Sequence, residues 1–312
     1  MRVFVTGGTG FIGVAIVRAL VERGDQPVVL TRNAASARAR LPKSAEVVEG
    51  DPQYAGEWQE QVSGCDAVVH LAGESVAGKR WDARFKQVIQ DSRTDSTARV
   101  VEAIANANSR PSVLVSASGA DFYPTGEELD ANTRAFEDDL VDESTPPGSS
   151  FLARVCRHWE REAAVAEEHG VRVVRMRTGL VLGSGGALDR LLTPFKLFVG
   201  GKIGSGQQWT SWIHVADVSA AYLFALDTAG LSGAVNVVSP ENARNKELSK
   251  ALGKAISRPS WMPVPGFALR AAVGEFAEYI LHGRRTHPGA LLAAGFEFRY
   301  PELSGALENL EL

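Results

Sequence analysis

The sequence predicts an α/β protein built on one doubly wound parallel sheet, with a smaller, mostly helical C-terminal domain. Three observations lead to this prediction. The chain opens with MRVFVTGGTGFIG, a short apolar run that ends in a glycine-rich turn, and an amphipathic pattern follows from Val14. Short apolar runs, typical of buried parallel strands, then alternate with helical patterns up to residue 178. From residue 239 onward the pattern is mostly helical and is punctuated by prolines.

The opening strand, turn and helix have the arrangement that binds a pyrophosphate in dinucleotide-binding folds. Gly7 makes the tight turn, Gly10 lets backbone amides approach the pyrophosphate, and Gly13 lets the helix pack closely on the strand. The pyrophosphate then lies at the positive end of the helix. An ordinary glycine-rich turn is the alternative, but the position between a strand and a helix favours the dinucleotide site. The cofactor-binding residues predicted in this unit are Thr6, Gly7, Gly8, Thr9, Gly10, Phe11, Ile12 and Gly13.

The end of the second predicted strand, residues 27–30, indicates which dinucleotide is bound. An acidic residue near this point holds the ribose 2′-hydroxyl of NAD(H), whereas an arginine accommodates the 2′-phosphate of NADP(H). Here Thr31 and Arg32 end the strand, and Arg38 and Arg40 follow. We therefore predict NADP(H) as the cofactor in preference to NAD(H). The alternative, a solvated face of arginines, fits Arg38 and Arg40 better than Arg32.

Three further strands deliver small or polar residues to the same edge of the sheet. A turn at residues 50–52 follows the strand 46–48 and would hold an adenine edge, and the strand 66–71 ends in Ala72-Gly73-Glu74. Small residues at a strand's carboxyl end let a cofactor lie against the backbone. After a helical pattern at 92–106, the strand 112–116 leads to two polar candidates, Ser118 and Tyr123. The remaining predicted cofactor-binding residues are Thr31, Arg32, Asp51, Leu71, Ala72, Gly73 and Ser116.

The second half of the chain divides less regularly. A polar, acidic excursion at 125–150 precedes a long helix at 150–169 and a strand at 171–176. Glycine clusters at 183–186 and 200–206 flank an apolar helix at 188–198, and the helix 218–226 and strand 234–238 then return to the sheet. We predict a dinucleotide-binding domain at 1–178, to which 205–238 return, and a smaller substrate domain or cap formed by 179–204 and 239–312.

Composition excludes several classes of function. The chain has 312 residues, 45% hydrophobic and 22% charged, as in ordinary globular proteins. Its formal net charge of −4 argues against a broad nucleic-acid or membrane surface. Two cysteines are too few for a disulfide framework, no histidine and cysteine spacing predicts a metal, and no targeting or membrane-spanning segment is expected. These features predict a cytoplasmic protein without nucleic-acid or membrane partners.

With these residues placed, the chain resembles the extended, epimerase-like branch of the short-chain dehydrogenase/reductase superfamily. Within it, the chain is similar to the atypical NAD-dependent epimerase/dehydratase subfamily, also called cell-division-inhibitor-like, which has its own C-terminal domain. The resemblance implies a Rossmann fold, NADP(H) or NAD(H) binding, and a substrate cleft beneath the C-terminal part. The matching segments are TGGTGFIG from Thr6, HLAGE from His70, Arg80-Trp81, Ser92-Arg93, SAS from Ser116, FLARVCRHWE from Phe151, RTGLVLG from Arg177, GSGQQWTSWIHVAD from Gly204, PVPGFALR from Pro263 and HPGALLAAGFEFRYPEL from His287.

The same resemblance shows where this sequence departs from active members. In those members a Tyr, and a Lys one helical turn later, carry the proton transfer that accompanies hydride movement. Aligning the helix on Glu160 puts Leu152 and Cys156 at these two places. Leucine has no proton to exchange, and cysteine cannot supply a fixed positive charge. A role for Cys156 as a small buried hydrophobic residue is favoured over a role as a nucleophile.

Three other residues are therefore the predicted catalytic candidates. Ser118 would bond a substrate oxygen, or it caps a local turn. Tyr123 would replace the missing phenol, or it packs as a partly buried aromatic. Glu74 would act as a carboxylate base, or it caps the next helix or pairs with Arg80.

A polar and aromatic stretch, Gln208–Trp212, is the predicted substrate-binding segment. Its amide, indoles and hydroxyls suit a polar ring-bearing ligand. An equally weighted alternative is that the tryptophans hold the cap against the sheet, and His214 is equally a core histidine or a substrate contact. The substrate-binding candidates are Arg177, Lys202, Gln208, Trp209, Ser211, Trp212 and His214.

Two functional hypotheses follow. The first is an NADP(H)-dependent oxidoreductase or epimerase with a non-standard proton donor, acting on a small polar substrate that resembles a sugar nucleotide. The second is a non-catalytic NADP(H)-binding sensor or scaffold that engages a protein partner. The nicotinamide itself carries hydride chemistry, so an intact cofactor half favours the enzyme. Relatives in the superfamily often pair through a helix bundle, so a homodimer is a further hypothesis.

Overall fold

The computed structural model describes residues 1–125 and 138–310 of the chain. Of the polar excursion predicted at 125–150, residues 126–137 lie outside this described part. Within the described part, no helix is both long enough and apolar enough to cross a membrane.

The core of the fold is a seven-stranded sheet in which every neighbouring pair of strands is parallel. The strand order is β11-β7-β5-β4-β1-β2-β3, so the chain reverses its direction of winding on the two sides of β1. This arrangement confirms the predicted doubly wound α/β class. It also puts a topological switch point between β1 and β4, where ligands bind in such sheets. The strands are β1 Arg2–Thr6, β2 Gln26–Thr31, β3 Glu46–Glu49, β4 Ala67–His70, β5 Val113–Gly119, β7 Arg172–Thr178 and β11 Gly233–Val237.

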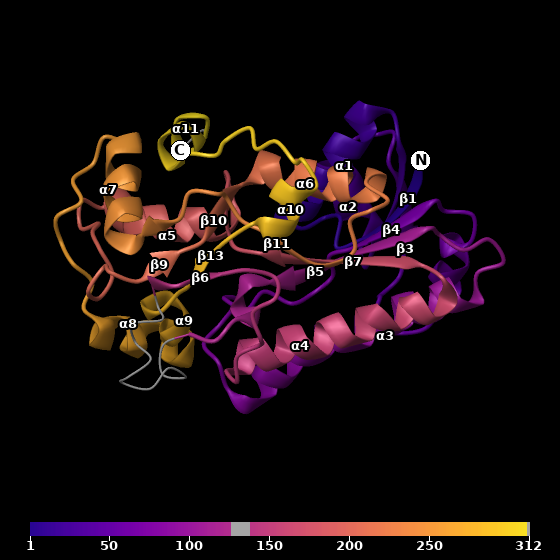
Figure 1. The fold of residues 1–312 in the computed structure, drawn as a ribbon, viewed down its shortest axis with the longest axis horizontal. Helices are drawn as coiled ribbons and strands as arrows, with labels where there is room; N and C mark the ends of the chain where they lie inside the picture. Colours follow the sequence, from indigo (N-terminus) through magenta and orange to yellow (C-terminus); the bar gives the residue numbers. More distant parts are fainter. Residues whose placement is uncertain (126–137, 311–312) are drawn as a thin grey trace.

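Helices cover both faces of this sheet (Figure 1). On one face lie α1 (Phe11–Arg23), α2 (Ala34–Arg40), α6 (Val215–Asp227) and α10 (Gly289–Ala293). On the other lie α3 (Ala83–Asn106) and α4 (Phe151–Ala164), the latter continued by a 3-10 turn at Val165–His169. Side chains alternate along β1 accordingly, because Val3 and Val5 join the core under α1 while Phe4 joins the opposite core.

Helix α3 is longer than the sequence pattern predicts, since it begins at Ala83 rather than near residue 92. Asp82 caps it, and its side chain accepts a hydrogen bond from the Phe85 amide at 2.6 Å. The added turns bury only Phe85 and Ile89, one helical turn apart. Such a sparse apolar pattern gives little periodicity for a sequence-based prediction.

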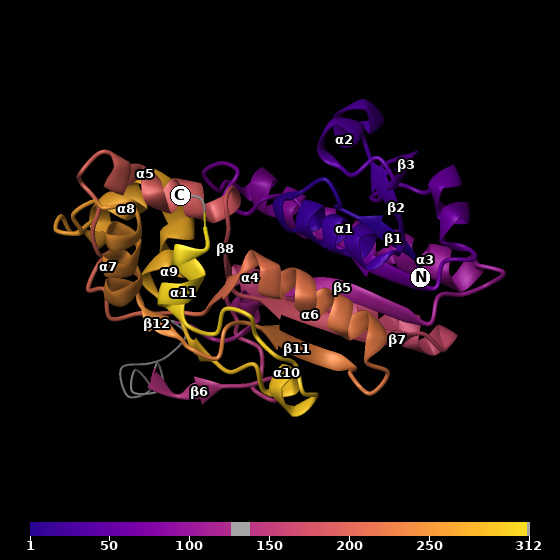
Figure 2. The same ribbon diagram turned by 90° about the horizontal axis from the view of Figure 1, so that it is seen from above.

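A second group of elements gathers at the carboxyl end of the sheet (Figures 1 and 2). Its helices are α5 (Gly186–Lys196), α7 (Asn245–Ala255), α8 (Gly266–Val273), α9 (Ala277–Leu281) and α11 (Leu303–Glu308). Three short strand pairs join it to the main sheet: β8 (Leu180–Leu182) with β10 (Trp212–His214), β9 (Trp209–Thr210) with β12 (Ala243–Arg244), and β6 (Leu140–Val141) with β13 (Arg285–Thr286).

The C-terminal segment does not stay within this second group. Leu291 of α10 and Phe296 pack into the core of the main sheet, on the same face as α1 and α6. The last helix, α11, then returns to pack on α7. The tail after residue 284 therefore crosses from the cap to the dinucleotide-binding half and back.

Candidate cofactor and substrate site

The glycine turn between β1 and α1 is shaped by backbone contacts. Gly7 has φ +69°, and a Cβ atom placed on it would lie 2.7 Å from the carbonyl carbon of Leu71. A Cβ atom on Gly13 would lie 2.2 Å from the Gly7 carbonyl oxygen, so α1 packs directly on the turn. In the described part of the chain no side chain caps the first turn of α1, and that turn contains no acidic residue. The positive end of this helix therefore suits an anion such as a pyrophosphate.

Thr6 and Ser116, both predicted to contact the cofactor, are instead buried. Thr6 is fully buried, and its Oγ1 accepts hydrogen bonds from the amides of Leu71 and Ala72 at 3.3 Å. The same oxygen lies 2.7 Å from His70 Nδ1. Burial lowers the pKa of His70 to about 3, so its imidazole is neutral. Thr6 thus holds β1 against β4 at the switch point, and it does not line the cavity formed by the described residues.

A cavity of about 360 Å³ lies at the carboxyl ends of β1, β2 and β4. Seven of the predicted cofactor residues line it: Gly7, Thr9, Thr31, Arg32, Asp51, Ala72 and Gly73. Residues absent from the sequence-based prediction also line it: Leu30, Asn33, Ser36, Ala37, Pro52, Gln53, Val88 and Ser92. The predicted turn near Asp51 and the predicted turn at Gly7 therefore open into one cavity.

One end of this cavity is basic. Arg32 and Arg40 both line it, whereas Arg38 is not among its described lining residues. Arg40 follows Ser36 by one helical turn on α2, so the two side chains share a face. That i, i+4 spacing is visible in the sequence, but it does not by itself mark either residue as part of a site. Two guanidinium groups at one end of the cavity suit a phosphate.

The opposite end of the cavity holds Glu74, one of the three predicted catalytic residues. Its amide donates to Ser92 Oγ at 3.0 Å, and its carboxylate accepts from the Ser75 amide at 3.2 Å. The alternative pairing with Arg80 is absent from the described contacts, because Arg80 donates to the Ala271 carbonyl instead. Glu74 is thus the predicted catalytic candidate that reaches the cavity.

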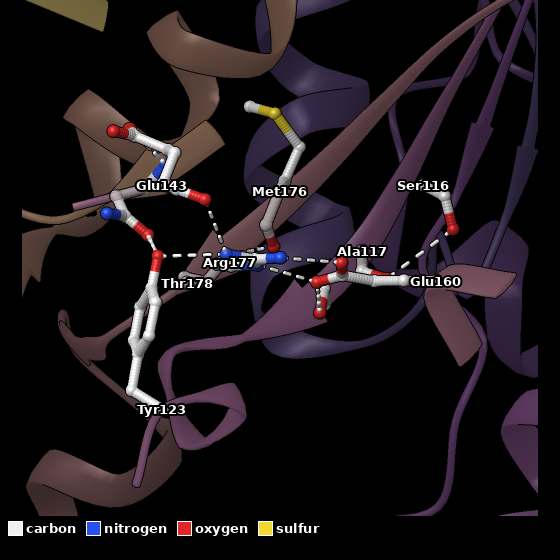
Figure 3. Close-up of polar contacts among 10 residues, drawn as sticks. Ser116, Ala117, Tyr123, Glu143, Glu160, Met176, Arg177 and Thr178 are labelled. Atoms are coloured by element: carbon white, nitrogen blue, oxygen red, sulfur yellow. Dashed lines mark hydrogen bonds and ion pairs between the residues drawn. The ribbon is translucent and has the colours of Figure 1, made fainter. Parts of the chain in front are cut away.

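Ser118, Tyr123 and Arg177 meet in a buried polar network rather than in the cleft. Figure 3 shows Tyr123, Arg177 and Glu160 of this network. Arg177 is 4% exposed, and its guanidinium donates to both carboxylate oxygens of Glu160, at 2.8 and 2.9 Å. It also donates to the Tyr123 hydroxyl at 3.0 Å, which in turn donates to Asn236 Oδ1 at 2.6 Å. Ser118 Oγ donates to Glu160 at 2.7 Å.

This network does not fit the roles predicted from the sequence. Tyr123 is fully buried, and burial raises the pKa of its phenol to about 12. Every polar group of the network has a protein partner, as buried polar groups require. The geometry therefore supports the structural alternatives for Ser118 and Tyr123, and it gives Arg177 an internal ion pair instead of a substrate.

The predicted substrate-binding stretch mostly joins the cap to the sheet. Trp212 is fully buried in the apolar cluster between α5, α7 and α11. Gln208 is buried and donates to the carbonyls of Ile203 and Ile280, and the Ser211 hydroxyl donates to Asn242 and to the Arg284 carbonyl. Trp209 is partly exposed, and the guanidinium groups of Arg244 and Arg285 lie 4.3 and 5.3 Å from the centre of its ring. These contacts favour the reading in which the tryptophans hold the cap in place.

The two remaining substrate candidates differ in exposure. His214 is 3% exposed, and its Nδ1 caps α6 by accepting from the Ala216 amide at 3.1 Å. Burial lowers the pKa of His214 to about 4, which makes it a neutral core histidine. Lys202 is exposed on the glycine loop, and its Nζ donates to the Ser205 carbonyl at 3.2 Å.

Helix α4 carries Leu152 and Cys156, the two residues predicted to replace the Tyr and the Lys. Leu152 is buried against Phe85 and Ile89 of α3. Cys156 is also buried, and burial raises the pKa of its thiol to about 12. Neither side chain offers an acid, a base or a positive charge at neutral pH. The described residues also contain no group of three or more His, Cys, Asp or Glu side chains that would hold a metal.

The parallel sheet, the glycine turn and the cavity at the switch point define a dinucleotide-binding α/β protein of the short-chain dehydrogenase/reductase type. More narrowly, residues 3–238 match the NAD dependent epimerase/dehydratase family, and the chain belongs to it. Residues 264–310 match a domain of unknown function, DUF1731. These two matches confirm the family that the sequence motifs resemble.

Relatives match over almost the whole chain. An epimerase family protein SDR39U1 homolog, chloroplastic, from Arabidopsis thaliana is 41% identical over 99% of this chain and 86% of its own length. Epimerase family protein YfhF of Bacillus subtilis is 35% identical over 99% and 98%. The crystal structure of human epimerase family protein SDR39U1 with NADPH has a TM-score of 0.83, with 32% identity over 99% and 98%. A Bacillus cereus UDP-glucuronic acid 4-epimerase has a TM-score of 0.78 at 19% identity over 99% and 97%, a likeness of fold alone.

Proposed function

We propose that this protein is an NADP(H)-dependent oxidoreductase or epimerase acting on a small polar substrate of the sugar-nucleotide kind. The observation that carries the proposal is the single cavity that joins the Gly7 turn at its middle to Arg32 and Arg40 at one end and Glu74 at the other. A dinucleotide laid along it would meet helix α1 at its pyrophosphate and the two arginines at its 2′-phosphate. The human relative solved with NADPH supports this assignment.

The residues present fit such a cofactor. The close approach of Gly7 to Leu71 leaves no room for a side chain where the pyrophosphate would pass, and Ala72 and Gly73 leave the end of β4 open. A bound nicotinamide supplies hydride chemistry to a carbonyl or hydroxyl group. The protein's part is to hold it at the carboxyl ends of β4 and β5, beneath the cap.

The cofactor assignment predicts the effect of changing Arg32. Arg32→Asp removes a charged hydrogen-bond donor and adds a repulsive carboxylate. We expect NADPH affinity to fall by about 30-fold, equivalent to roughly 2 kcal/mol, with NADH affinity little changed. Fluorescence titration of the purified protein with each nucleotide measures both.

Arg38→Asp is the matched control, because Arg38 is an exposed arginine on the helix that follows Arg32, α2, but is not among the described residues that line the cavity. It should leave both affinities near those of the wild type. An equal loss of NADPH and NADH binding in Arg32→Asp would contradict the 2′-phosphate assignment.

A second candidate function is a cofactor-binding sensor or scaffold that engages a protein partner. The buried Leu152 and Cys156, which leave α4 without an acid or a charge, favour it. Pull-down of partners from a lysate with and without NADPH tests this reading. Partner binding that ignores the cofactor argues against sensing, and NADPH oxidation with any of a series of aldehydes, ketones or sugar nucleotides argues for the enzyme.

A further inference from the structure

A cluster of titratable side chains from four separate elements lies at the carboxyl end of β5. Asp121 belongs to a 3-10 turn, Ala120–Phe122, that directly follows the last residue of that strand, Gly119. Arg93 comes from α3, Cys156 from α4 and Tyr279 from α9. None of the buried contacts described above uses the Asp121 carboxylate.

Gly119 brings two members of this cluster together. A Cβ atom placed on Gly119 would lie 3.4 Å from Cys156 Sγ and 3.6 Å from Asp121 Oδ2. The thiol and the carboxyl therefore flank the same side of the glycine. Both separations are ordinary van der Waals distances, so the thiol and the carboxyl both lie directly against the end of the strand.

Arg93 connects the cluster with the cofactor cavity. Its Cζ lies 3.3 Å from the Cβ position of Gly73, and its Nη1 donates to the Glu74 carbonyl oxygen at 3.0 Å. Gly73 and Glu74 both line the cavity. The positive charge of Arg93 also acts on Asp121. Arg93 thus connects Asp121, at the carboxyl end of β5, with the end of the cavity opposite the two arginines.

The surroundings give Asp121 a protonation behaviour unlike that of its neighbours. The residue is exposed to solvent, yet protein atoms crowd its carboxyl, and this desolvation raises the pKa of Asp121 to about 6 while Arg93 opposes the rise. Cys156 and Tyr279 stay protonated at neutral pH, because burial raises the pKa of each. Among the other carboxylates nearby, Glu160 is ion-paired with Arg177, while Glu74 and Glu275 act electrostatically on Arg93 and Tyr279. Asp121 is therefore the member of the cluster that exchanges a proton near physiological pH.

We propose, building on the proposed function, that Asp121 is the acid and base of the substrate cleft, in place of the phenol that α4 lacks. In the reducing direction the carboxyl O–H bond breaks and its proton passes to the substrate carbonyl oxygen, while NADPH supplies the hydride to the carbonyl carbon. An alcohol, NADP⁺ and the Asp121 carboxylate result, and the carboxylate regains a proton from water. Arg93 is a positioning residue, because its positive charge stabilises the Asp121 carboxylate beside the cofactor.

NMR of the side-chain carboxyl carbons, in protein labelled with ¹³C-aspartate, tests the role of Asp121 without any substrate. Asp121→Asn assigns the resonance by its disappearance, and Asp95→Asn, which removes an exposed carboxylate of α3, is the matched control. We expect Asp121 to titrate near pH 6 in the free protein. We expect it to titrate at lower pH with NADP⁺ than with NADPH, because the oxidised ring is positively charged.

Two results would overturn the role of Asp121: a carboxyl that titrates below pH 4, or one that responds to neither nucleotide although NADPH binds by fluorescence. An absence of NADPH binding instead refutes the proposed function, so the two failures are distinguishable.

Turnover gives a second readout. With NADPH and a series of aldehydes, ketones and UDP-glucose, Asp121→Asn should lower kcat about 100-fold or more at unchanged NADPH affinity. Asp95→Asn should turn over like the wild type. Loss of turnover in Tyr279→Phe with full activity in Asp121→Asn would transfer the role to the phenol and overturn the proposal.

Discussion

Arg32 and Arg177 carry the same guanidinium group but lie in opposite surroundings. Arg32 is exposed at the end of the cofactor cavity, whereas Arg177 is 4% exposed and paired with Glu160. A buried charge costs several kcal/mol unless a partner and hydrogen bonds compensate it. Residue type alone predicts a ligand contact for both arginines, and burial separates them.

This pairing predicts the cost of breaking the buried network. Glu160→Gln leaves the Arg177 charge uncompensated, and we expect the free energy of unfolding to fall by about 3–5 kcal/mol. Replacing both partners, in Glu160→Gln with Arg177→Met, should cost less because no isolated charge remains. Urea denaturation followed by circular dichroism measures each variant.

Glu162→Gln is the control for this series, since Glu162 lies on the same helix and makes only a surface ion pair at 3.6 Å. Its loss should change stability by less than about 1 kcal/mol. A Glu160→Gln variant as stable as Glu162→Gln would contradict a stabilising role for the buried ion pair.

Among the elements, the glycine turn and α1 act as one unit. The helix can approach the turn only because Gly13 has no side chain, given the 2.2 Å that would separate its Cβ from the Gly7 carbonyl. The second glycine loop has a similar packing reason, because Gly183 and Gly186 leave room for the ring of Phe11. Both loops therefore serve the position of α1, and with it the proposed pyrophosphate site.

Gly13→Ala tests this unit. We expect the added methyl group to push α1 away from the turn, to lower the free energy of unfolding by roughly 1–3 kcal/mol and to weaken NADPH binding. Gly305→Ala is the matched control, because nothing lies within 4 Å of its Cβ position in the described structure. Thermal unfolding and NADPH titration of both variants decide whether the packing matters.

Across the whole molecule, the C-terminal tail ties the cap to the dinucleotide-binding half. Phe296 packs edge-on against Phe224 of α6 and against Phe298, and it is 7% exposed. Asn236 of β11 adds a polar connection, since its side chain donates to the His287 carbonyl at 2.8 Å. The C-terminal tail therefore shares the core of the main sheet, while α5, α7 and α11 of the cap form an apolar cluster of their own. This connection through the tail argues for a single cooperative unfolding transition.

Phe296→Ala tests this shared core. Removing a buried ring should lower the free energy of unfolding by about 3–5 kcal/mol, seen as an earlier transition of the entire protein. Phe267→Ala, at a residue that is 76% exposed, should leave stability nearly unchanged. Separate transitions for the two halves in Phe296→Ala would contradict the shared core.

Much of the fold could be predicted because contiguous segments of the sequence determine it. The apolar strand, the glycines and the helix at residues 2–23 follow one another directly, so local backbone geometry specifies the turn. The strand pattern likewise predicts the parallel sheet. The absence of a catalytic acid on α4 can be predicted from the residue types at 152 and 156, which are Leu152 and Cys156. The length predicted for α3 is too short because the first turns of this helix bury few side chains.

Whether each polar candidate residue is buried or reaches the cavity depends on tertiary structure. Tyr123 bonds Asn236, 113 residues away, and Arg177 bonds Glu160 on a different element, so the sequence pattern cannot distinguish these partners from a substrate. The Asp121 cluster likewise draws on elements far apart in the chain. The sequence by itself determined the sheet and the glycine turn, because neighbouring residues make them. Only packing between distant elements decided which polar groups are buried and which reach the cavity.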